Sequence, residues 1–344
     1  MTERKRCTWV HDSLYIRDNG DVFPCCHLQP AAVGNIYKTS LKTIYNDERI
    51  KTFRQQEIDG TLKCMKGCTL PQVSPVEPML DHDYDQDLKR VLFSFGEKCN
   101  IRCIMCSQNH DSRVELTEEV ITQNIEIPKS RPTVTLLGGE PLILKSAKRF
   151  IDHWAGHGAK MALLTNGTAL SEDMARKIAE NFSIISFSLN AATKEIHETV
   201  NAGSRFEKVV RNVGRMIEAK KQAKTKVVIV GHMTIVVENV HEIPDFIRKR
   251  DEFGFEHINF GYDKKVPPYL ADNPELNDEL IRAIAVEVAR EHNPRRIDLH
   301  RLRLLGLVGQ PGARAPVPVS LASTRSRVRW TWSSSITAPC TLRP

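Results

Sequence analysis

The sequence predicts an α/β fold in which helices cover a parallel sheet. From about residue 90 onward, six short and nearly continuous apolar segments alternate with amphipathic segments. Strands that are buried on both faces have this composition, and helices commonly connect parallel strands. The candidate strands are VLFSF (91–95), TVTLL (133–137), MALLT (161–165), SIISFSL (183–189), KVVIVGHMTIV (226–236) and HINFGY (257–262). Such strands form either an open doubly wound sheet or a barrel, complete or partial.

Periodic apolar residues predict the helices between these strands. Ser171 is placed to cap the helix after the third strand, and Asn273 with Pro274 would begin a later one. The two clearest apolar stripes, with spacings of three and four residues, are Leu144, Ala147, Phe150, Ile151 and Trp154, and Phe206, Val209, Val210, Val213, Met216 and Ile217.

Length and composition restrict how the cysteines are interpreted. The 344 residues, 41% of them hydrophobic, suffice for one large and one small domain. The amino-terminal stretch MTERKRCTWVHD lacks the apolar run of a signal peptide, and no long apolar span is present, so we expect a cytoplasmic protein. Disulfides are rare in that compartment, and clustered cysteines there indicate metal binding or catalysis.

The nine cysteines form two groups and one isolated residue, which suggests two separate sites. The first group is Cys7, Cys25, Cys26, Cys64 and Cys68, the second is Cys99, Cys103 and Cys106, and the isolated residue is Cys340.

Two segments differ from the rest in composition. Residues 71–90 contain three prolines and five acidic residues, and we expect them to be a linker. Residues 301–344 contain seven arginines, no lysine and no acidic residue, so they account for the formal net charge of +7. The neutral remainder indicates neither a nucleic-acid nor a membrane partner. We interpret residues 293–344 as an irregular tail, either disordered or produced by a frameshift near Arg301, in preference to a basic binding segment.

The second cysteine group lies where ligands are expected to bind. CNIRCIMC, with the spacing C-x3-C-x2-C, follows the first predicted strand, and Gly138-Gly139-Glu140-Pro141 follows the second. Both follow carboxyl ends of strands, which form the ligand-binding edge in open sheets and in barrels. The two glycines permit a positive φ and a close approach to the main chain, and Glu140 supplies a carboxylate for a cationic group. The alternative is a simple tight turn, but the neighbouring cysteines favour a ligand site.

Three thiolates are one ligand short of a closed metal site. His110 could complete a structural zinc site with three cysteines and one histidine. A four-iron cluster that is held by three cysteines instead leaves one iron open to an outside ligand. The position at the ligand-binding edge favours the iron–sulfur cluster.

With Thr165-Asn166-Gly167 after the third strand and Ser188-x-Asn190 at the end of the fourth, these motifs resemble the radical S-adenosylmethionine (radical SAM) superfamily. The resemblance implies a partial (β/α)6, TIM-like barrel over residues 91–292. It implies an oxidoreductase or isomerase that cleaves SAM reductively at a [4Fe–4S] cluster to give a 5′-deoxyadenosyl radical, which abstracts hydrogen from a substrate. It also implies a reductase such as flavodoxin or ferredoxin as the electron donor.

The resemblance also implies roles for individual residues in the first two motifs. Cys99, Cys103 and Cys106 would be the three cluster ligands, and the backbone of Met105 would meet the adenine of SAM.

The glycine motif and the later motifs would complete the SAM site. Gly138, Gly139 and Glu140 would hold the methionine amino group, and Thr165 or Asn166 would line the same pocket.

Two further polar residues have two interpretations. Ser188 and Asn190, on one face of a strand, would contact the ribose or the carboxylate of SAM, or would simply be polar ends of a barrel strand. We expect His232, in the fifth strand, to be a packed histidine.

Residues 1–70 resemble the twitch module, the shorter relative of the SPASM extension that holds an auxiliary [4Fe–4S] cluster in many radical SAM enzymes. Here the module precedes the barrel, whereas it usually follows it. The resemblance implies a second, closed cluster, although a closed zinc site also fits so many thiols. Its implied ligands are Cys7, Cys25, Cys64 and Cys68, with Cys26 as the alternative to Cys25.

The substrate class stays open at this point. Enzymes with such extensions often modify peptides or proteins, and others act on sugars or nucleotides. The alternative from a different class is a zinc-stabilised binding module without radical chemistry.

Overall fold

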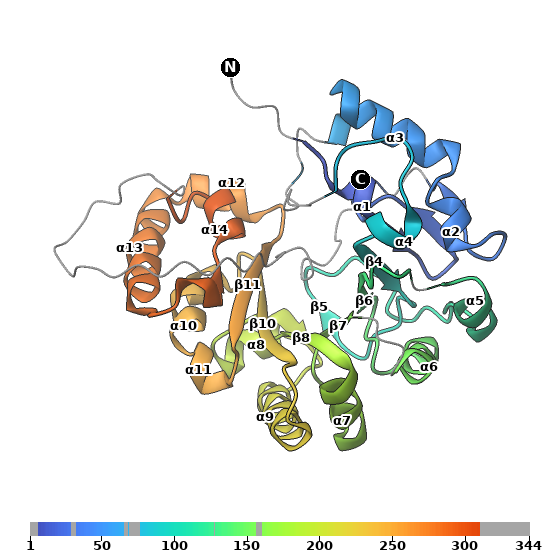
Figure 1. Ribbon diagram of the computed structural model, residues 1–344. Coiled ribbons are helices and arrows are strands. Elements are labelled where there is room, and N and C mark those ends of the chain that lie inside the picture. The colour runs from blue at the N-terminus through green and yellow to red at the C-terminus, as the bar shows by residue number, and fades with distance from the viewer. Residues whose placement is uncertain are drawn as a thin grey trace.

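The computed structural model describes residues 6–28, 32–64, 68, 76–126, 128–155 and 160–309, and a sheet of ten strands organises it (Figure 1). The strand order is β12-β11-β10-β8-β7-β6-β4-β1-β2-β3. The six predicted strands are confirmed as β4 (Arg90–Ser94), β6 (Thr133–Leu137), β7 (Lys160–Thr165), β8 (Phe182–Ser188), β10 (Val228–Ile235) and β11 (His257–Tyr262). They pair in parallel throughout and curve into a partial barrel.

Helices line the outer side of the curved sheet (Figure 1). They include α5 (Glu118–Gln123), α6 (Lys145–Trp154), α7 (Glu172–Asn181), α8 (Lys194–Val200), α9 (Phe206–Ala223), α10 (Ile243–Arg248), α11 (Arg250–Phe253), α12 (Val266–Asp272) and α13 (Pro274–Arg290). Both predicted apolar stripes are confirmed on α6 and α9, where they pack against the main core. The predicted helix starts are also confirmed, because Ser171 accepts a hydrogen bond from the Met174 amide and α13 begins at Pro274.

The amino-terminal region extends the same sheet, which the sequence did not predict. β1 (Ser13–Ile16) pairs in parallel with β4, while β2 (Asp21–Phe23) and β3 (Gly34–Asn35) continue antiparallel. The short helix α1 (Trp9–Asp12) leads into β1, and α2 (Leu41–Ile44) and α3 (Glu48–Asp59) follow β3. Backbone hydrogen bonds therefore join this region directly to the first strand of the barrel.

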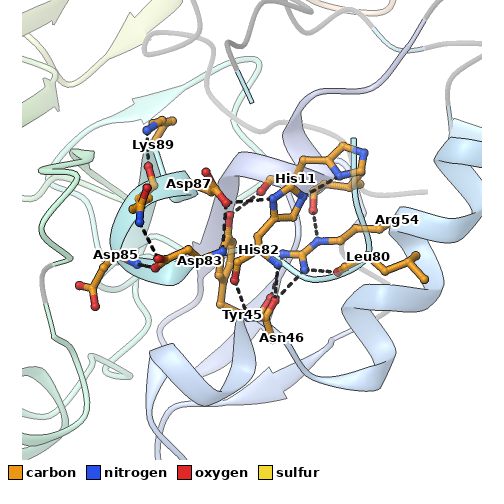
Figure 2. Close-up of polar contacts among 12 residues, drawn as sticks. His11, Tyr45, Asn46, Arg54, Leu80, His82, Asp83, Asp85, Asp87 and Lys89 are labelled. Carbon is orange, nitrogen blue, oxygen red and sulfur yellow. Dashed lines mark hydrogen bonds and ion pairs between the residues drawn. The ribbon is translucent and has the colours of Figure 1, made fainter. Parts of the chain in front are cut away.

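A buried polar network holds the amino-terminal region together (Figure 2). The Arg54 guanidinium donates to the carbonyl oxygens of Tyr45 and Leu80, at 2.8 and 2.7 Å. The ring nitrogens of His11 and His82 lie 3.1 Å apart. Burial lowers the pKa of His82 to about 4, so this ring is neutral near pH 7. The network thus ties α3 and α1 to the segment that leads into the barrel.

Hydrophobic residues form one large core and a smaller second cluster. The smaller cluster comprises Cys7, Trp9, Val10, Tyr15, Phe23, Cys25, Cys26, Leu62, Cys68, Leu92 and Leu137. Leu92 and Leu137 come from β4 and β6, so the amino-terminal cysteines pack against the first strands of the barrel.

The structure describes residues 76–90 of the expected linker and residues 293–309 of the expected tail. Within residues 76–90, α4 (Tyr84–Asp87) forms and Tyr84 and Leu88 enter the main core. Residues 293–309 form η3 (Pro294–Arg296), β12 (Ile297–Asp298) and α14 (His300–Leu304), and Leu302 and Leu307 are buried. Residues 1–5, 71–75 and 310–344 lie outside the described residues. The domain boundaries at residues 70, 90 and 292 remain predictions.

Candidate functional site

A pocket at the carboxyl ends of the barrel strands brings together residues from each predicted motif. Its lining consists of Tyr15, Cys99, Ile101, Cys103, Met105, Cys106, Gln108, His110, Leu137, Gly138, Gly139, Leu164, Thr165, Asn166, Ser188, Asn190 and Thr234. Of the residues predicted to contact SAM or to ligate its cluster, Glu140 alone is absent from this lining. The lining therefore combines three thiols with main-chain and polar groups.

The three-cysteine loop is held in place by backbone hydrogen bonds. The Cys99 amide donates to the His110 carbonyl oxygen at 3.1 Å, and the Cys106 amide donates to the Cys103 carbonyl oxygen at 3.0 Å. The short strands β5 (Arg102–Cys103) and β9 (Asn201–Ala202) pair antiparallel, with Cys103 opposite Asn201. The loop is thereby fixed to the segment that follows α8.

The three thiols of this loop are close enough to influence one another. All three are half-buried. Burial raises the pKa of Cys103 to about 12, and the nearby Cys106 and Cys99 raise it as well. Burial likewise raises the pKa of Cys99 and of Cys106. Thiolates that repel one another in a pocket suit a cationic metal centre, which would stabilise them together.

The two glycines pass directly against the backbone that precedes Cys99. Gly138 has a φ of +133°, a conformation that residues with a side chain rarely adopt. A Cβ atom on Gly139 would lie 2.0 Å from the Lys98 carbonyl oxygen. The Gly139 amide donates to the Gly96 carbonyl oxygen at 2.8 Å. Glycine is therefore required here by close backbone packing as well as by the exposure of main-chain groups to the pocket.

The Glu140 carboxylate is buried and connects the ends of two strands. It accepts hydrogen bonds from the Leu142 amide at 3.0 Å, the Thr165 hydroxyl at 2.8 Å and the Asn166 amide at 2.7 Å. Burial raises its pKa to about 7, although these three hydrogen bonds act in the opposite direction. In this structure the carboxylate positions Thr165 and Asn166, both of which line the pocket.

Asn166 connects the third-strand loop to the cysteine loop. Its side-chain amide donates to the Asn100 side-chain oxygen at 3.0 Å and lies 3.6 Å from the Cys99 sulfur. Amides that donate to a ligating sulfur commonly tune a metal centre.

Ser188 and Asn190 both line the pocket, although β8 ends at Ser188. Asn190 has a φ of +59°, and its side chain accepts from the Thr234 amide at 2.7 Å and donates to the Asn201 side-chain oxygen at 2.9 Å. His232 is buried as expected, with its ring 2.5 Å from the Asn259 oxygen and 3.1 Å from the Thr234 hydroxyl.

The amino-terminal cysteines lie in a more closed environment. Cys7, Cys25, Cys26 and Cys68 are buried, and Cys64 is half-buried. Burial raises the pKa of Cys7 to about 12, and Cys68 and Cys64 also raise it. Burial raises the pKa of Cys25 too, with Cys7 and Cys64 among the other causes. The four predicted ligands thus lie within electrostatic reach of one another. Burial does not distinguish Cys25 from Cys26.

Glu57 fixes the backbone at the first of these cysteines. Its carboxylate accepts from the Cys7 amide at 3.2 Å and forms two hydrogen bonds with the Arg6 guanidinium, at 2.8 and 3.1 Å. His11, which belongs to the network of Figure 2, lies 3.2 Å from the same carboxylate.

Across the described ranges, no three His, Cys, Asp or Glu side chains are grouped closely enough to hold one metal ion. A single ion needs ligands that converge on one point, whereas an iron–sulfur cluster binds its thiolates at separate iron atoms.

Tyr15 is a site residue that the sequence analysis missed. It lines the pocket and also belongs to the cluster that contains the amino-terminal cysteines. Its hydroxyl bonds to Ser94, and its ring centroid lies 6.2 Å from that of Phe23. No local motif marks this tyrosine. The pairing of β1 with β4 places it, and that pairing has no signal in a single sequence.

Comparison with family models identifies two domains in this chain. The model of the radical SAM superfamily matches residues 93–250. The model of the SPASM iron–sulfur cluster-binding domain matches residues 7–69. The chain is therefore a radical SAM protein with an amino-terminal SPASM domain, as the sequence motifs predicted. Together, the two matches support binding of SAM and of a [4Fe–4S] cluster.

Curated relatives share part of the chain. Mycofactocin maturase MftC from Mycobacterium ulcerans is 25% identical over 162 residues, which are 45% of this chain and 42% of that protein. GTP 3′,8-cyclase from Desulforamulus reducens is 26% identical over 196 residues, 53% of this chain and 57% of that protein. The chain spans about half the length of these relatives.

Solved structures show limited likeness. Streptococcus suis SuiB bound to the precursor peptide SuiA has a TM-score of 0.47 and 15% identity, over 85% of this chain and 72% of that one. Native anSMEcpe with bound AdoMet and Cp18Cys peptide has a TM-score of 0.41 and 19% identity, over 56% of this chain and 60% of that one. Among the described residues, the helices are too short or too polar to span a membrane.

Proposed function

We propose that this chain is a radical SAM oxidoreductase or isomerase whose SAM cluster is held by Cys99, Cys103 and Cys106. When bound, the [4Fe–4S] cluster and SAM supply a 5′-deoxyadenosyl radical that abstracts hydrogen from a substrate. The observation that carries the proposal is that three thiols and the main chain of Gly138 and Gly139 line one pocket at the carboxyl ends of the strands.

The residues of the pocket bind and orient SAM. The three thiolates leave one coordination position for it, and Gly138 and Gly139 present main-chain groups to its methionine end. Glu140 acts beside them by holding Thr165 and Asn166 at the pocket wall.

The opposite part of the lining completes the SAM site. Ser188 and Asn190 supply polar contacts, and the backbone of Met105 lies on the cysteine side for the adenine. Ile101, Leu137 and Leu164 make the remaining wall apolar, which keeps water away from a reactive radical.

The amino-terminal region holds a second cluster in this proposal. Cys7, Cys25, Cys64 and Cys68, all of which are free thiols, would close a [4Fe–4S] cluster with four thiolates. Their burial and mutual proximity support this ligand set. A closed cluster of this kind would transfer electrons or shape the substrate site.

A peptide or protein is the substrate class that we favour, because a curated relative is named as a maturase of mycofactocin. The relative named GTP 3′,8-cyclase supports a nucleotide as the second candidate. Cytoplasmic flavodoxin or ferredoxin would provide the electrons, in keeping with the expected compartment.

Anaerobic reconstitution tests the proposal. We expect about eight irons per chain, as two four-iron clusters require, and SAM-dependent release of 5′-deoxyadenosine with dithionite as reductant. Zinc in place of iron, or iron without deoxyadenosine, would contradict the proposal.

A further inference from the structure

The mouth of the barrel is divided into an apolar and a polar half. On the inner faces of β4, β6 and β7, the side chains of Leu92, Leu137 and Leu164 lie next to the amino-terminal cysteine cluster. The other half, formed by β8 and β10, is lined by polar groups, as Ser188 and Thr234 show, and β11 pairs with β10 beside it.

Polar groups continue along the inner faces of that second half. Residues two apart on a strand share a face, so Ser186 and His232 face the same side as Ser188 and Thr234. The Ser186 hydroxyl is buried and has no hydrogen-bond partner among the described residues. Asn259 is paired in register with His232 and bonds to its ring.

Arg301 places a permanent positive charge at the edge of this polar half. It lies on α14, which packs on β11, and its guanidinium carbon is 6.0 Å from the centroid of the Tyr262 ring at the carboxyl end of β11. The start of α14 is fixed by Asp298, whose carboxylate accepts from the His300 amide at 2.9 Å.

Arg301 interacts electrostatically with residues of both halves of the site. Burial lowers the pKa of its guanidinium, whereas Tyr262 and Cys68 act in the opposite direction. Burial lowers the pKa of His232 to about 4, and the positive charge of Arg301 contributes to this shift. The guanidinium, 6.0 Å from the Tyr262 ring centroid, therefore interacts electrostatically with Cys68 and with His232 of β10.

The guanidinium lacks an acidic partner. Within the described part of the chain, no carboxylate forms an ion pair with Arg301, and Asp298 acts on it only as a more distant charge. Half-buried arginines are usually paired with an anion, because desolvating an unpaired charge is costly. A substrate anion at this position would supply that partner.

We propose that Arg301 anchors an anionic group of the substrate, a carboxylate or a phosphate, at the polar half of the barrel mouth. The inference rests on the proposed function, because it names the substrate class of that site. The planar guanidinium suits bidentate contact with either group, and the Thr234 hydroxyl of β10, which lines the pocket, would contact the neutral part of the same molecule.

Anion binding to the reconstituted full chain tests this proposal without reference to turnover. The probes are triglutamate, which carries carboxylates, and inorganic pyrophosphate, measured by isothermal titration calorimetry. We expect at least one probe to bind, and Arg301→Gln to weaken that binding by roughly tenfold to a hundredfold, as loss of a charge-assisted hydrogen bond does. Binding of triglutamate alone would identify a carboxylate, and binding of pyrophosphate alone a phosphate.

Two further variants make the result interpretable. Arg301→Lys keeps the charge but not the bidentate geometry, and should bind with intermediate affinity. Arg282→Gln removes an exposed arginine from α13 and should bind the probe like the wild type. Iron content and circular dichroism show whether each variant folds.

Three outcomes overturn the inference. In the first, the wild type binds neither probe. In the second, the wild type and Arg301→Gln bind the probes equally. In the third, Arg301→Gln changes the reduction potential of the amino-terminal cluster without changing anion binding. The last would assign Arg301 to the cysteines instead of the substrate. Absence of deoxyadenosine with Arg301-dependent anion binding would contradict the proposed function but not the anion site.

Discussion

The two cysteine groups occupy different environments in one molecule. Cys99, Cys103 and Cys106 are half-buried on a loop that faces an open pocket. Cys7 and Cys25, in contrast, are 4% and 3% exposed and belong to a hydrophobic cluster. The first group is arranged for access by a small molecule, whereas the second is arranged to be sealed. The same type of side chain thus occupies an accessible environment in one group and an enclosed environment in the other.

Removing each group separately tests this difference most strongly. The triple variant Cys99→Ser, Cys103→Ser, Cys106→Ser should lose about four of about eight irons and all deoxyadenosine formation. The variant Cys7→Ser, Cys64→Ser, Cys68→Ser should lose a similar amount of iron but keep SAM cleavage. Iron analysis and product chromatography provide the measurements, and loss of SAM cleavage in both variants would remove the distinction.

Gly139 is expected to be essential for the backbone packing beside the pocket that contains Cys99, Cys103 and Cys106. In Gly139→Ala the new Cβ would meet the Lys98 carbonyl oxygen at 2.0 Å, so we expect a loss of about 3 kcal/mol in the free energy of unfolding and at least tenfold weaker SAM binding. Gly214→Ala is the matched control, because apart from the neighbouring backbone of α9 no atom lies within 4 Å of its Cβ position. It should stabilise the protein by about 0.5–1 kcal/mol. Urea unfolding and equilibrium dialysis measure the two effects, and equal behaviour of the variants would refute the close packing.

The raised pKa of Glu140 predicts that the free energy of unfolding depends on pH. Its pKa is raised from 4.5 to about 7 in the folded protein, so the folded state holds this proton more tightly than the unfolded chain. The stability that it contributes is complete below pH 4.5 and is lost as the pH rises through 7, by up to about 3 kcal/mol.

Replacement of the Glu140 carboxylate tests whether stability falls as the pH rises. In Glu140→Gln that part of the pH dependence should disappear, as urea unfolding at pH 5 and pH 8 would show for both proteins. An unchanged difference between wild type and variant at the two pH values would exclude titration of Glu140 in this range.

Tyr15 lines the pocket and also belongs to the hydrophobic cluster of the amino-terminal cysteines. Removal of its hydroxyl is expected to change stability less than the substitutions above. Tyr15→Phe removes the bond to Ser94 but keeps the ring, so it should cost about 1 kcal/mol and leave the iron content unchanged. Thermal unfolding and iron analysis suffice. Loss of iron from either group would show that the hydroxyl does more than hold the ring in place.

Local patterns in the sequence predicted much of the barrel. Each of the six strands is a short apolar run, and the apolar stripes on α6 and α9 have helical spacing. Buried elements of this kind can be predicted from the spacing of apolar residues alone. The cysteine and glycine motifs were placed at one edge because parallel strands share their carboxyl ends. Their meeting in one pocket follows from that rule.

Features that depend on distant partners were not predicted. The sequence SLYI of β1 does not indicate that this strand pairs with β4. Likewise, the residues around Glu140 do not indicate that its carboxylate will accept hydrogen bonds from Thr165 and Asn166. Composition suggested that Arg301 begins an irregular tail, yet Leu302 beside it is fully buried. In each case the outcome depends on tertiary contacts, which override local composition.

The pairing of β1 with β4 has a consequence for synthesis on the ribosome. Ser13 leaves the exit tunnel long before Arg90, its partner in the sheet, has been translated. Until then β1 is an unprotected edge strand, which invites association with other nascent chains. Contacts this distant in sequence also form slowly. β1 is therefore synthesised well before it can reach its final place in the sheet, which requires β4.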